Sequence, residues 1–434
     1  MNIRKLFVMG FLITGSMTNV HAAEVQGDNW SRFRGPNGSG ISHAKTVPQN
    51  WTKDDYNWVL NLPGRGHGSP VVVGNKLYVV SGKRKTADRI VVCVDTKKKE
   101  FLWQRTFSSA KHRLHPANNY GSSTPVADAQ GVIVTWASPD RLILKAINSD
   151  GKTKWTRDLG PYQAINGAGT SPIIVEDLVI VTNIQMDPEV FIRAGVLPKD
   201  YKFKPKKSYV VAVDRQTGKT RWQLERKTFL AGYATPCMRR LKNGQQELIF
   251  LDSFYGLTGV NPRNGKVNWQ TKRLLSSRTV ASPVIAGDLI LGSHGRGVSA
   301  EILYAVRPGN RDTKPRVEFE IRKGPPLVPT PIAKDGLAFL WADNGVVSCI
   351  QIKNGQQVWR KRVGGNYYAS PVWVNGRLYC VDRGGMVAVI AAAKKYKLIA
   401  KVSLGERSFA TPAVANGVMY FRTETKLMSL GGKK

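Results

Sequence analysis

One stretch of the chain, residues 330–361, contains four short apolar segments separated by glycine turns and reads TPIAKDGLAFLWADNGVVSCIQIKNGQQVWRK. The turns are Asp335-Gly336, Asp343-Asn344-Gly345 and Asn354-Gly355, and glycine there supplies the positive φ that tight hairpins need. Pro331 cannot donate to a β-ladder, so it belongs at the start of a strand. The stretch therefore predicts one four-stranded antiparallel sheet that begins after Thr330 and ends near Trp359.

The same unit recurs along the chain. Each copy opens with a Ser-Pro or Thr-Pro pair, and most copies end with a glycine turn followed by a tryptophan. The opening prolines are spaced by 40 to 64 residues, with a mean of about 49, and are Pro70, Pro125, Pro172, Pro236, Pro283, Pro331, Pro371 and Pro412. One such sheet is marginal alone, so eight copies at this period indicate a closed ring of small sheets.

The two ends of the chain complement each other. The last unit, which opens at Thr411-Pro412, has only three predicted strands, whereas residues 56–62 form a strand with no unit of its own. Trp58 lies 12 residues before Pro70, as Trp359 lies 12 residues before Pro371. We therefore predict an all-β fold, an eight-bladed β-propeller of four-stranded antiparallel blades. Its ring is closed by an N-terminal strand that completes the last blade, and the tryptophans pack between neighbouring blades.

The N-terminus has the pattern of a secretory signal. Arg4 and Lys5 precede an apolar stretch at 6–13, and Val20-His21-Ala22 is a small-residue cleavage site. The predicted organisation is a signal peptide at 1–22, an N-terminal extension at 23–50 and the propeller at 51–434. The apolar stretch is too short for a stable membrane span, although an uncleaved anchor stays open. No cysteine precedes Cys93, so we expect an exported protein, periplasmic or secreted, that is not lipid-anchored.

The composition is strongly basic, with 65 Lys and Arg against 30 Asp and Glu and a net charge of +35. Such a charge attracts polyanions. Export makes nucleic acid an unfavoured target, so the expected partner is another protein or an acidic polysaccharide or other envelope polymer. A merely solubilising surface explains the charge equally well. The densest basic run is 199–207.

The four cysteines are far apart in sequence and none are adjacent: Cys93, Cys237, Cys349 and Cys380. Export permits disulfides, and the repeat places Cys349 and Cys380 in neighbouring units. Four separate buried thiols are the favoured prediction, and one bridge between Cys349 and Cys380 is the alternative.

The repeat resembles the pyrroloquinoline-quinone (PQQ) repeat, which forms the blades of quinoprotein alcohol dehydrogenases. It is similar also to the blades of the propeller lipoprotein of the outer-membrane barrel-assembly machinery. The resemblance rests on the Ser/Thr-Pro opening and on the Asp/Asn-x-x-(Thr/Asn)-Gly-Lys-x-x-Trp close, as at 214–222 and 261–269, and it covers about residues 50–430. Residues 30–40, WSRFRGPNGSG, resemble the N-terminal signature of exported proteins with this repeat. No predicted strand precedes these glycines and no helix follows, so they do not predict a phosphate loop.

The connections between blades gather at one mouth of the channel in such a propeller. Residues rich in Tyr, Arg, His and Asn precede several of the opening prolines, a composition that suits a planar or sugar-like anionic ligand. Loop packing is the alternative explanation. The predicted ligand-binding residues are His67, Tyr120, Asn166, Tyr233, Arg278, Tyr367 and Arg407.

The residues support a catalytic function less than a binding function. The resemblance implies PQQ held with Ca²⁺ beside an aspartate base. It also implies a quinone between a tryptophan and a disulfide of adjacent cysteines, but this sequence has no adjacent cysteines. Asp252 and Asp343 are the best candidate carboxylates, and His112-x-x-His115 lacks the glutamate of a zinc motif. We therefore assign no catalytic residue, metal or cofactor and expect a binding or scaffold module. A PQQ-dependent alcohol or sugar dehydrogenase, with PQQ and Ca²⁺, and an outer-membrane protein assembly factor are the alternatives.

Overall fold

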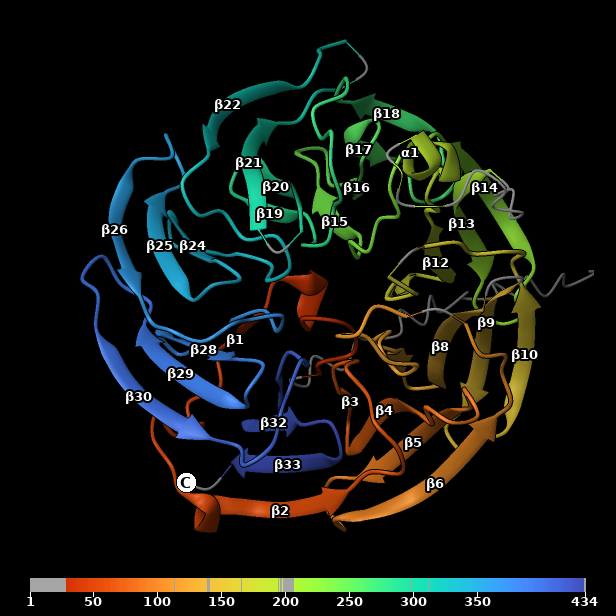
Figure 1. The fold of residues 1–434 in the computed structure, drawn as a ribbon, viewed down its shortest axis with the longest axis vertical. Helices are drawn as coiled ribbons and strands as arrows, with labels where there is room; N and C mark the ends of the chain where they lie inside the picture. Colours follow the sequence, from red (N-terminus) through yellow and green to blue (C-terminus); the bar gives the residue numbers. More distant parts are fainter. Residues whose placement is uncertain are drawn as a thin grey trace, which may run out of the picture.

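Among the described residues, eight antiparallel sheets stand around a central axis in the computed structural model (Figure 1). The structure describes residues 29–432 except 113, 139–140, 165, 194, 196, 198–206, 298 and 311. The predicted signal peptide at 1–22 and most of the basic run at 199–207 lie outside these residues. The ring confirms the predicted eight-bladed β-propeller.

Each blade follows the predicted strand order from the channel outward. Blade 1 consists of β3 (Val71–Val73), β4 (Lys76–Gly82), β5 (Arg89–Asp95) and β6 (Glu100–Phe107), and blade 2 of β7 (Val126–Asp128), β8 (Gly131–Ser138), β9 (Arg141–Asn148) and β10 (Thr153–Asp158). Blade 3 consists of β11 (Ile173–Val175), β12 (Leu178–Asn183), β13 (Ser208–Asp214) and β14 (Thr220–Arg226). Blade 4 consists of β15 (Cys237–Arg240), β16 (Gln246–Asp252), β17 (Gly256–Val260) and β18 (Val267–Gln270). Blade 5 consists of β19 (Val284–Ala286), β20 (Leu289–Arg296), β21 (Ser299–Arg307) and β22 (Arg316–Ile321). Blade 6 consists of β23 (Ile332–Lys334), β24 (Leu337–Trp341), β25 (Val346–Gln351) and β26 (Gln357–Arg362). Blade 7 consists of β27 (Val372–Val374), β28 (Arg377–Val381), β29 (Met386–Ala391) and β30 (Leu398–Ser403).

Blade 8 joins the two ends of the chain. Its inner strands are β31 (Ala413–Ala415), β32 (Val418–Arg422) and β33 (Lys426–Gly431), and its outer strand is β2 (Tyr56–Asn61). β2 pairs antiparallel with β33, with Trp58 opposite Ser429. The predicted closure by the strand around Trp58 is therefore confirmed.

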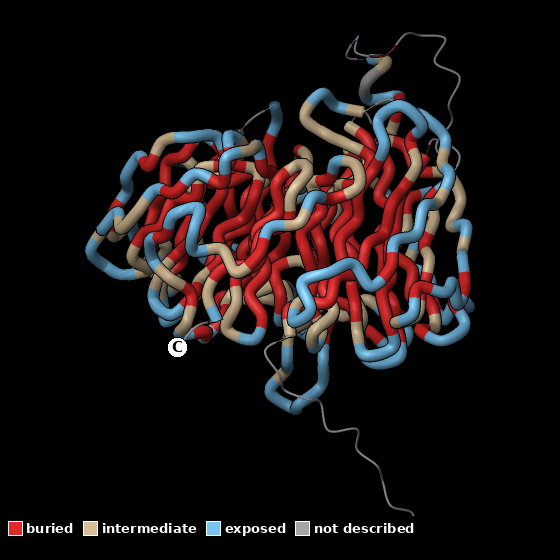
Figure 2. Tube along the Cα trace, turned by 90° about the horizontal axis from the view of Figure 1, so that it is seen from below, coloured by how far each residue is buried: buried red, intermediate tan, exposed pale blue. Residues whose placement is uncertain are grey.

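The middle strands of the blades form the core. Every residue of β5 is buried, whereas Trp103 is the only buried residue of β6. Figure 2 shows the same gradient, with buried segments inside the ring and exposed segments at its turns and rim. Both faces of a middle strand pack against neighbouring blades, and for this reason these strands are continuously apolar instead of alternating.

Tryptophans of the outer strands lock several blades to the next blade. The indole N–H of Trp222 donates to the carbonyl of Pro262 at 2.7 Å, in the turn between the third and fourth strands of blade 4. Trp103, Trp155 and Trp359 donate in the same way to Ser149, Arg215 and Ala393 at 2.9, 3.1 and 2.9 Å. A glycine lets the turn approach the ring, because a Cβ on Gly265 would lie 2.7 Å from Trp222.

Replacing Gly265 by alanine tests this contact, with Gly287→Ala as the control. Both glycines have positive φ, 72° and 61°, but a Cβ on Gly287 would meet nothing within 4 Å. Gly287→Ala should cost about 1–2 kcal/mol from backbone strain alone. Gly265→Ala should cost measurably more in urea unfolding, because Trp222 must also move. Equal losses would contradict the proposed blade contact.

A ring of hydrogen bonds runs through the residues that precede the opening prolines. The backbone N–H of Thr330 donates to the hydroxyl of Ser370 in the next blade at 2.9 Å. Six further junctions are the same, at 2.9 to 3.1 Å: Ser69 to Thr124, Thr124 to Ser171, Thr235 to Ser282, Ser282 to Thr330, Ser370 to Thr411 and Thr411 to Ser69. These N–H groups are buried and need partners. The described residues show no such bond from Ser171 to Thr235, so the hydroxyl at this position has this structural role in every blade except blade 4.

The hydroxyl ring is tested by Thr330→Val, with Thr330→Ser as the control. Valine removes the acceptor of the Ser282 N–H group and keeps the shape of the side chain, whereas serine keeps the oxygen. A buried N–H left without a partner costs about 1–3 kcal/mol. We expect the valine variant to unfold at lower urea concentration than the serine variant. If the serine variant loses as much stability as the valine variant, the methyl group of Thr330 and not the hydrogen bond is responsible for the loss.

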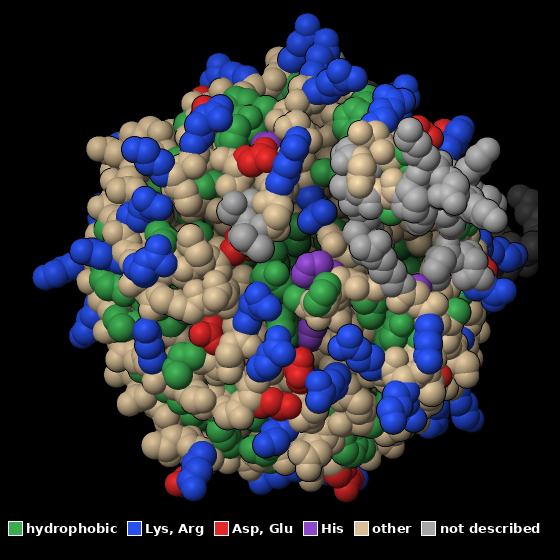
Figure 3. All heavy atoms as spheres, in the orientation of Figure 1, with side chains coloured by type: hydrophobic (Ala, Val, Ile, Leu, Met, Phe, Trp, Pro, Cys, Tyr) green, Lys and Arg blue, Asp and Glu red, His purple; other side chains and the backbone are tan. Residues whose placement is uncertain are grey.

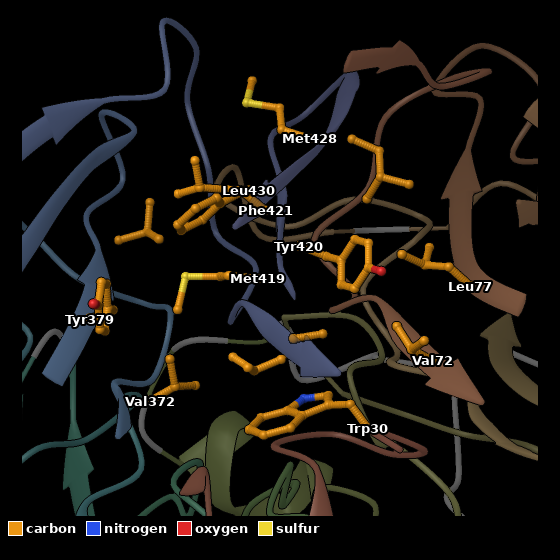
Figure 4. Close-up of a cluster of buried hydrophobic side chains, with 14 of the residues drawn as sticks. Trp30, Val72, Leu77, Val372, Tyr379, Met419, Tyr420, Phe421, Met428 and Leu430 are labelled. Carbon is orange, nitrogen blue, oxygen red and sulfur yellow. The ribbon is translucent and has the colours of Figure 1, made fainter. Parts of the chain in front are cut away.

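The segment before the propeller crosses the end of the channel opposite the inter-blade connections. Trp30 exchanges backbone hydrogen bonds of 2.9 Å with Val72 of blade 1, and Figure 4 shows its ring among side chains of blades 1, 7 and 8. The side chain of Asn37 pairs with the backbone of Met238 in blade 4 at 2.7 Å. β1 (Ile41–Ser42) adds to blade 7 as a strand parallel to β27. The described part of the predicted 23–50 extension is thus packed into the ring.

Arg34 anchors this segment. Its guanidinium is fully buried and donates to the carbonyls of Thr330, Pro331, Gly38 and Ser39. Burial lowers the pKa of Arg34 to about 9. Among the described residues, the hydrogen-bond partners of Arg34 are backbone carbonyls and include no carboxylate. Carbonyl dipoles therefore solvate the buried positive charge.

Helix is scarce in the described part of the chain. It consists of η1 (Pro36–Gly38), η2 (Lys53–Asp55) and α1 (Pro188–Arg193). None of these helices has the length and apolar character that crossing a membrane requires.

Candidate functional site at the channel mouth

A cavity of about 260 Å³ opens where the inter-blade connections converge. All eight connections contribute to its wall, and Phe33 of the N-terminal segment reaches it from the opposite end. Six residues of the hydroxyl ring also line it: Ser69, Thr124, Ser171, Thr235, Thr330 and Thr411. On the face drawn in Figure 3, apolar and histidine side chains occupy the central hollow, and many Lys and Arg side chains surround it.

One position of the repeat points into the cavity in every blade. It is the residue three places before the opening proline, and its eight members are His67, Ser122, Gly169, Tyr233, Val280, Val328, Tyr368 and Phe409. The hydroxyl ring fixes the backbone just before the proline in the same way at seven of the eight junctions. Side chains of extended segments alternate in direction. The residue two places before the Ser or Thr of the hydroxyl ring therefore has the same orientation from blade to blade.

Aromatic side chains from blades 7, 8 and 1 form a continuous arc in this ring. The centroid of Phe409 lies 4.1 Å from the imidazole of His67 and 6.0 Å from the ring of Tyr368. The guanidinium of Arg383 lies 4.8 Å from the centroid of Tyr368, and that of Arg407 lies 5.3 Å from the centroid of Phe409. The Nε of Arg383 is buried without a hydrogen-bond partner among the described residues. The arc thus combines ring faces with cations.

The opposite wall is polar. With its amide oxygen turned toward Arg278, the side chain of Asn166 accepts from both terminal nitrogens of that guanidinium at 3.1 and 3.2 Å. Burial raises the pKa of Tyr233 to about 12, although Arg278 and Asn166 act in the opposite direction. Tyr233 is therefore a neutral hydroxyl beside a positive charge.

His67 is neutral in this environment. Burial lowers its pKa to about 3, and the charges of Arg422, Arg407 and Arg383 lower it further in that order. The carboxylate of Glu424 lies 3.9 Å from Nε2, too far for a hydrogen bond, so the arginines dominate. Burial and these three arginines together therefore disfavour a proton on His67.

The low pKa of His67 predicts a specific pH dependence of stability. The unfolded chain takes up a proton near pH 6.5 and the folded chain near pH 3, so stability falls as the pH falls through this window. The slope reaches about 1.4 kcal/mol per pH unit. His67→Phe should flatten the urea-unfolding stability between pH 6.5 and 4 relative to the parent protein. Parallel profiles would show that His67 is not the titrating group.

The predicted ligand-binding residues divide into two groups. His67, Asn166, Tyr233 and Arg278 line the cavity. The other three do not: Tyr120 is buried beneath Arg89 and bonded to the His112 carbonyl, Tyr367 packs edge-on against Trp341, and Arg407 is exposed above Phe409. Their role as ligand contacts stays a prediction.

Sequence reasoning missed several residues of the mouth. The constant offset from proline would have selected Tyr368 instead of Tyr367 and Phe409 instead of Arg407. No sequence signal marks Phe33, which lines the cavity from outside the repeats. None marks Arg383 either, which lies over the ring of Tyr368 and comes from the turn between β28 and β29.

The mouth does not fit a quinone held by Ca²⁺. Calcium needs several oxygen ligands that include carboxylates, but no Asp or Glu is present in the described lining of the cavity. Asp252 is buried in an ion pair of 2.6 Å with Arg226, and Asp343 accepts the backbone N–H groups of Leu327 and Val328. Across the described residues, no three His, Cys, Asp or Glu side chains are grouped to hold a metal ion.

The histidine pair and the cysteines have local explanations. The Nδ1 of His115 accepts the N–H of Ala117, and that of His112 lies 3.3 Å from the Ala110 carbonyl. All four cysteines are buried free thiols: Cys93, Cys237, Cys349 and Cys380. The prediction of separate buried thiols is thus confirmed.

Comparison with known proteins agrees with the fold. A family model described as outer membrane protein assembly factor BamB matches residues 120–330 and 299–430. Curated proteins with that name are similar: the one of Moranella endobia is 25% identical over 231 residues, which are 49% of this chain and 56% of the relative. The one of Yersinia pestis is 24% identical over 223 residues, 49% of this chain and 53% of the relative. The aligned part is about half the length of these relatives.

Solved structures show the same architecture at low identity. BamB of Moraxella catarrhalis superposes with a TM-score of 0.56 and 14% identity, covering 86% of this chain and 96% of that one. The quinohemoprotein alcohol dehydrogenase of Comamonas testosteroni gives 0.61 and 12%, covering 94% and 81%. These two likenesses concern the fold alone. The family model, in contrast, matches most of the repeats, and the chain therefore belongs to the PQQ-repeat β-propeller family described as outer membrane protein assembly factor BamB.

Proposed function

We propose that this protein is a binding scaffold of the cell envelope that docks a protein partner at the channel mouth. The partner would insert an apolar or aromatic side chain, flanked by acidic residues, into the cavity. The observation that carries this proposal is the aromatic arc of His67, Phe409 and Tyr368 beneath two arginines, in a cavity without a carboxylate in its described lining.

The size and chemistry of the cavity support a partner's side chain over a free cofactor. Its volume of about 260 Å³ is below the roughly 300–1,000 Å³ of typical ligand pockets. Ring faces offer apolar contact, and the guanidiniums of Arg278, Arg383 and Arg407 offer charge-assisted hydrogen bonds to carboxylates. An acidic segment would also be steered by the net charge of +35.

The family match makes outer membrane protein assembly the first biological role to test. Curated relatives carry the name of assembly factors for outer membrane proteins. The signal-like N-terminus supports export to the compartment where such assembly takes place. An anionic glycan remains a second ligand class for the same mouth, because acidic sugars would meet the same arginines. A PQQ dehydrogenase is disfavoured because the described lining contains no carboxylate to hold Ca²⁺.

The proposal predicts the ligand preference and the effect of one arginine. A labelled peptide with one phenylalanine between acidic residues should bind more tightly than its alanine counterpart of equal charge. Arg383→Ala should weaken this binding about tenfold, about 1.4 kcal/mol, because one guanidinium over a ring is lost. Fluorescence anisotropy at fixed ionic strength measures both effects.

Arg360→Ala is the matched control, because it removes the same charge from the exposed outer strand β26. Equal losses in the two variants would mean that overall charge and not the mouth binds the peptide. If polygalacturonate binds with the same Arg383 dependence and the peptides do not, the partner is an anionic glycan. For the biological role, deletion should lower the level of folded outer membrane proteins, and Arg360→Ala but not Arg383→Ala should restore it.

A further inference from the structure

The contact between blades 4 and 5 departs from the hydrogen-bond pattern made by Trp103, Trp155, Trp222 and Trp359. Trp269 occupies the position of Trp222, but its indole N–H donates to the carboxylate of Glu247 in its own blade at 3.0 Å. Gly259 permits this arrangement, because a Cβ there would lie 2.2 Å from the indole nitrogen of Trp269 and 2.8 Å from the carboxyl carbon of Glu247. Departures from a repeat's rule concentrate at functional sites, so this contact is a candidate site.

A groove with a volume of about 790 Å³ lies beside Glu247. It is formed by turns at the face opposite the channel mouth, from blades 3, 4 and 5. Its described lining is Glu176, Arg239, Leu241, Asn243, Gly244, Gln245, Gln246, Glu247, Asn261, Pro262, Arg263, Asn268, Gly309, Asn310 and Asp312. Its described lining has no residue in common with that of the mouth.

A buried polar network forms one wall of the groove. The carboxylate of Glu247 accepts from Asn268 at 2.9 Å and from Trp269, and Arg239 lies 3.4 Å away. The Nη1 of Arg239 is buried without a hydrogen-bond partner among the described residues. Buried charged groups are costly when incompletely paired, so a ligand that completes this network would be favoured.

Amide groups with free hydrogen-bonding capacity face the same groove. The side chain of Gln246 makes no hydrogen bond to a described residue, Asn268 uses only its nitrogen, and Asn261 uses only its oxygen. Amides offer both donors and acceptors. Apolar side chains are represented in the described lining by Leu241 and Pro262 alone, so the groove has little to hold the side chains of a peptide.

We propose that this groove binds a neutral carbohydrate chain. Sugar hydroxyls both donate and accept, which matches the mixture of amides, carboxylates and guanidiniums. Glu176, Glu247 and Asp312 would repel a polyanion, and Arg239 and Arg263 would repel a cation. Trp269 is 4% exposed and offers no stacking platform, so hydrogen bonds carry the recognition and the affinity is weak.

The test titrates the full-length protein with neutral tetrasaccharides, namely cellotetraose, maltotetraose and chitotetraose, by isothermal calorimetry. At least one should bind with a dissociation constant below about 10 mM. Gln246→Ala should weaken this binding about fivefold or more, because one amide contact is lost. Gln357→Ala is the control, since it removes an exposed amide from β26 in blade 6.

Three outcomes would overturn the proposal: no binding of any tetrasaccharide at 10 mM or so, equal losses in the two glutamine variants, or tighter binding of polygalacturonate that depends on Gln246. Gln246→Ala should leave peptide binding at the mouth unchanged, because Gln246 does not line that cavity. Failure at this groove and failure at the mouth are therefore separate results.

Discussion

The hydrogen bonds between successive Ser and Thr residues are the interaction on which the rest of the structure depends. Each of these residues lies directly before a proline, where the chain enters the inner strand of a blade. Its N–H is buried next to the channel and would be unpaired without the hydroxyl of the following blade. The bond from Thr411 to Ser69 joins positions 342 residues apart and links the last blade to the first. The strand β2 closes blade 8 at the rim, and the Thr411–Ser69 hydrogen bond joins blades 8 and 1 near the axis.

The hydroxyl ring also shapes the mouth. Next to it, the residue three places before every opening proline lies in the cavity wall. Chemical variety at this one position gives the mouth its character: it is aromatic on blades 7, 8, 1 and 4, small on blades 2 and 3, and aliphatic on blades 5 and 6. The N-terminal segment, held by buried Arg34, crosses the other end, so a ligand reaches the cavity from the side of the connections.

The fold is shared by enzymes and by non-enzymatic scaffolds, and function lies in the residues placed on it. Here the repeat elements remain, while Asp252 and Asp343, the carboxylates that could have served a quinone site, are used to hold Arg226 and the backbone at Leu327 and Val328. The mouth instead collects arginines against rings. The groove at Glu247 has a different chemistry, with amides and carboxylates in place of aromatic faces. Two such surfaces on opposite faces are consistent with a scaffold.

The sequence by itself determined the architecture: the period of the Ser/Thr-Pro pairs set the number of blades, and the position of Trp58 identified the closing strand. These features are local, because proline, glycine turns and apolar strands act over a few residues. It also placed His67, Asn166, Tyr233 and Arg278 near the mouth. Only the tertiary structure decided that Tyr368 and not Tyr367 lines the cavity, that Phe33 joins it and that Arg383 lies over the ring of Tyr368. It also decided that Trp269 turns inward to Glu247. Those outcomes depend on side-chain direction and on contacts between segments far apart in the chain, which short-range sequence patterns do not encode.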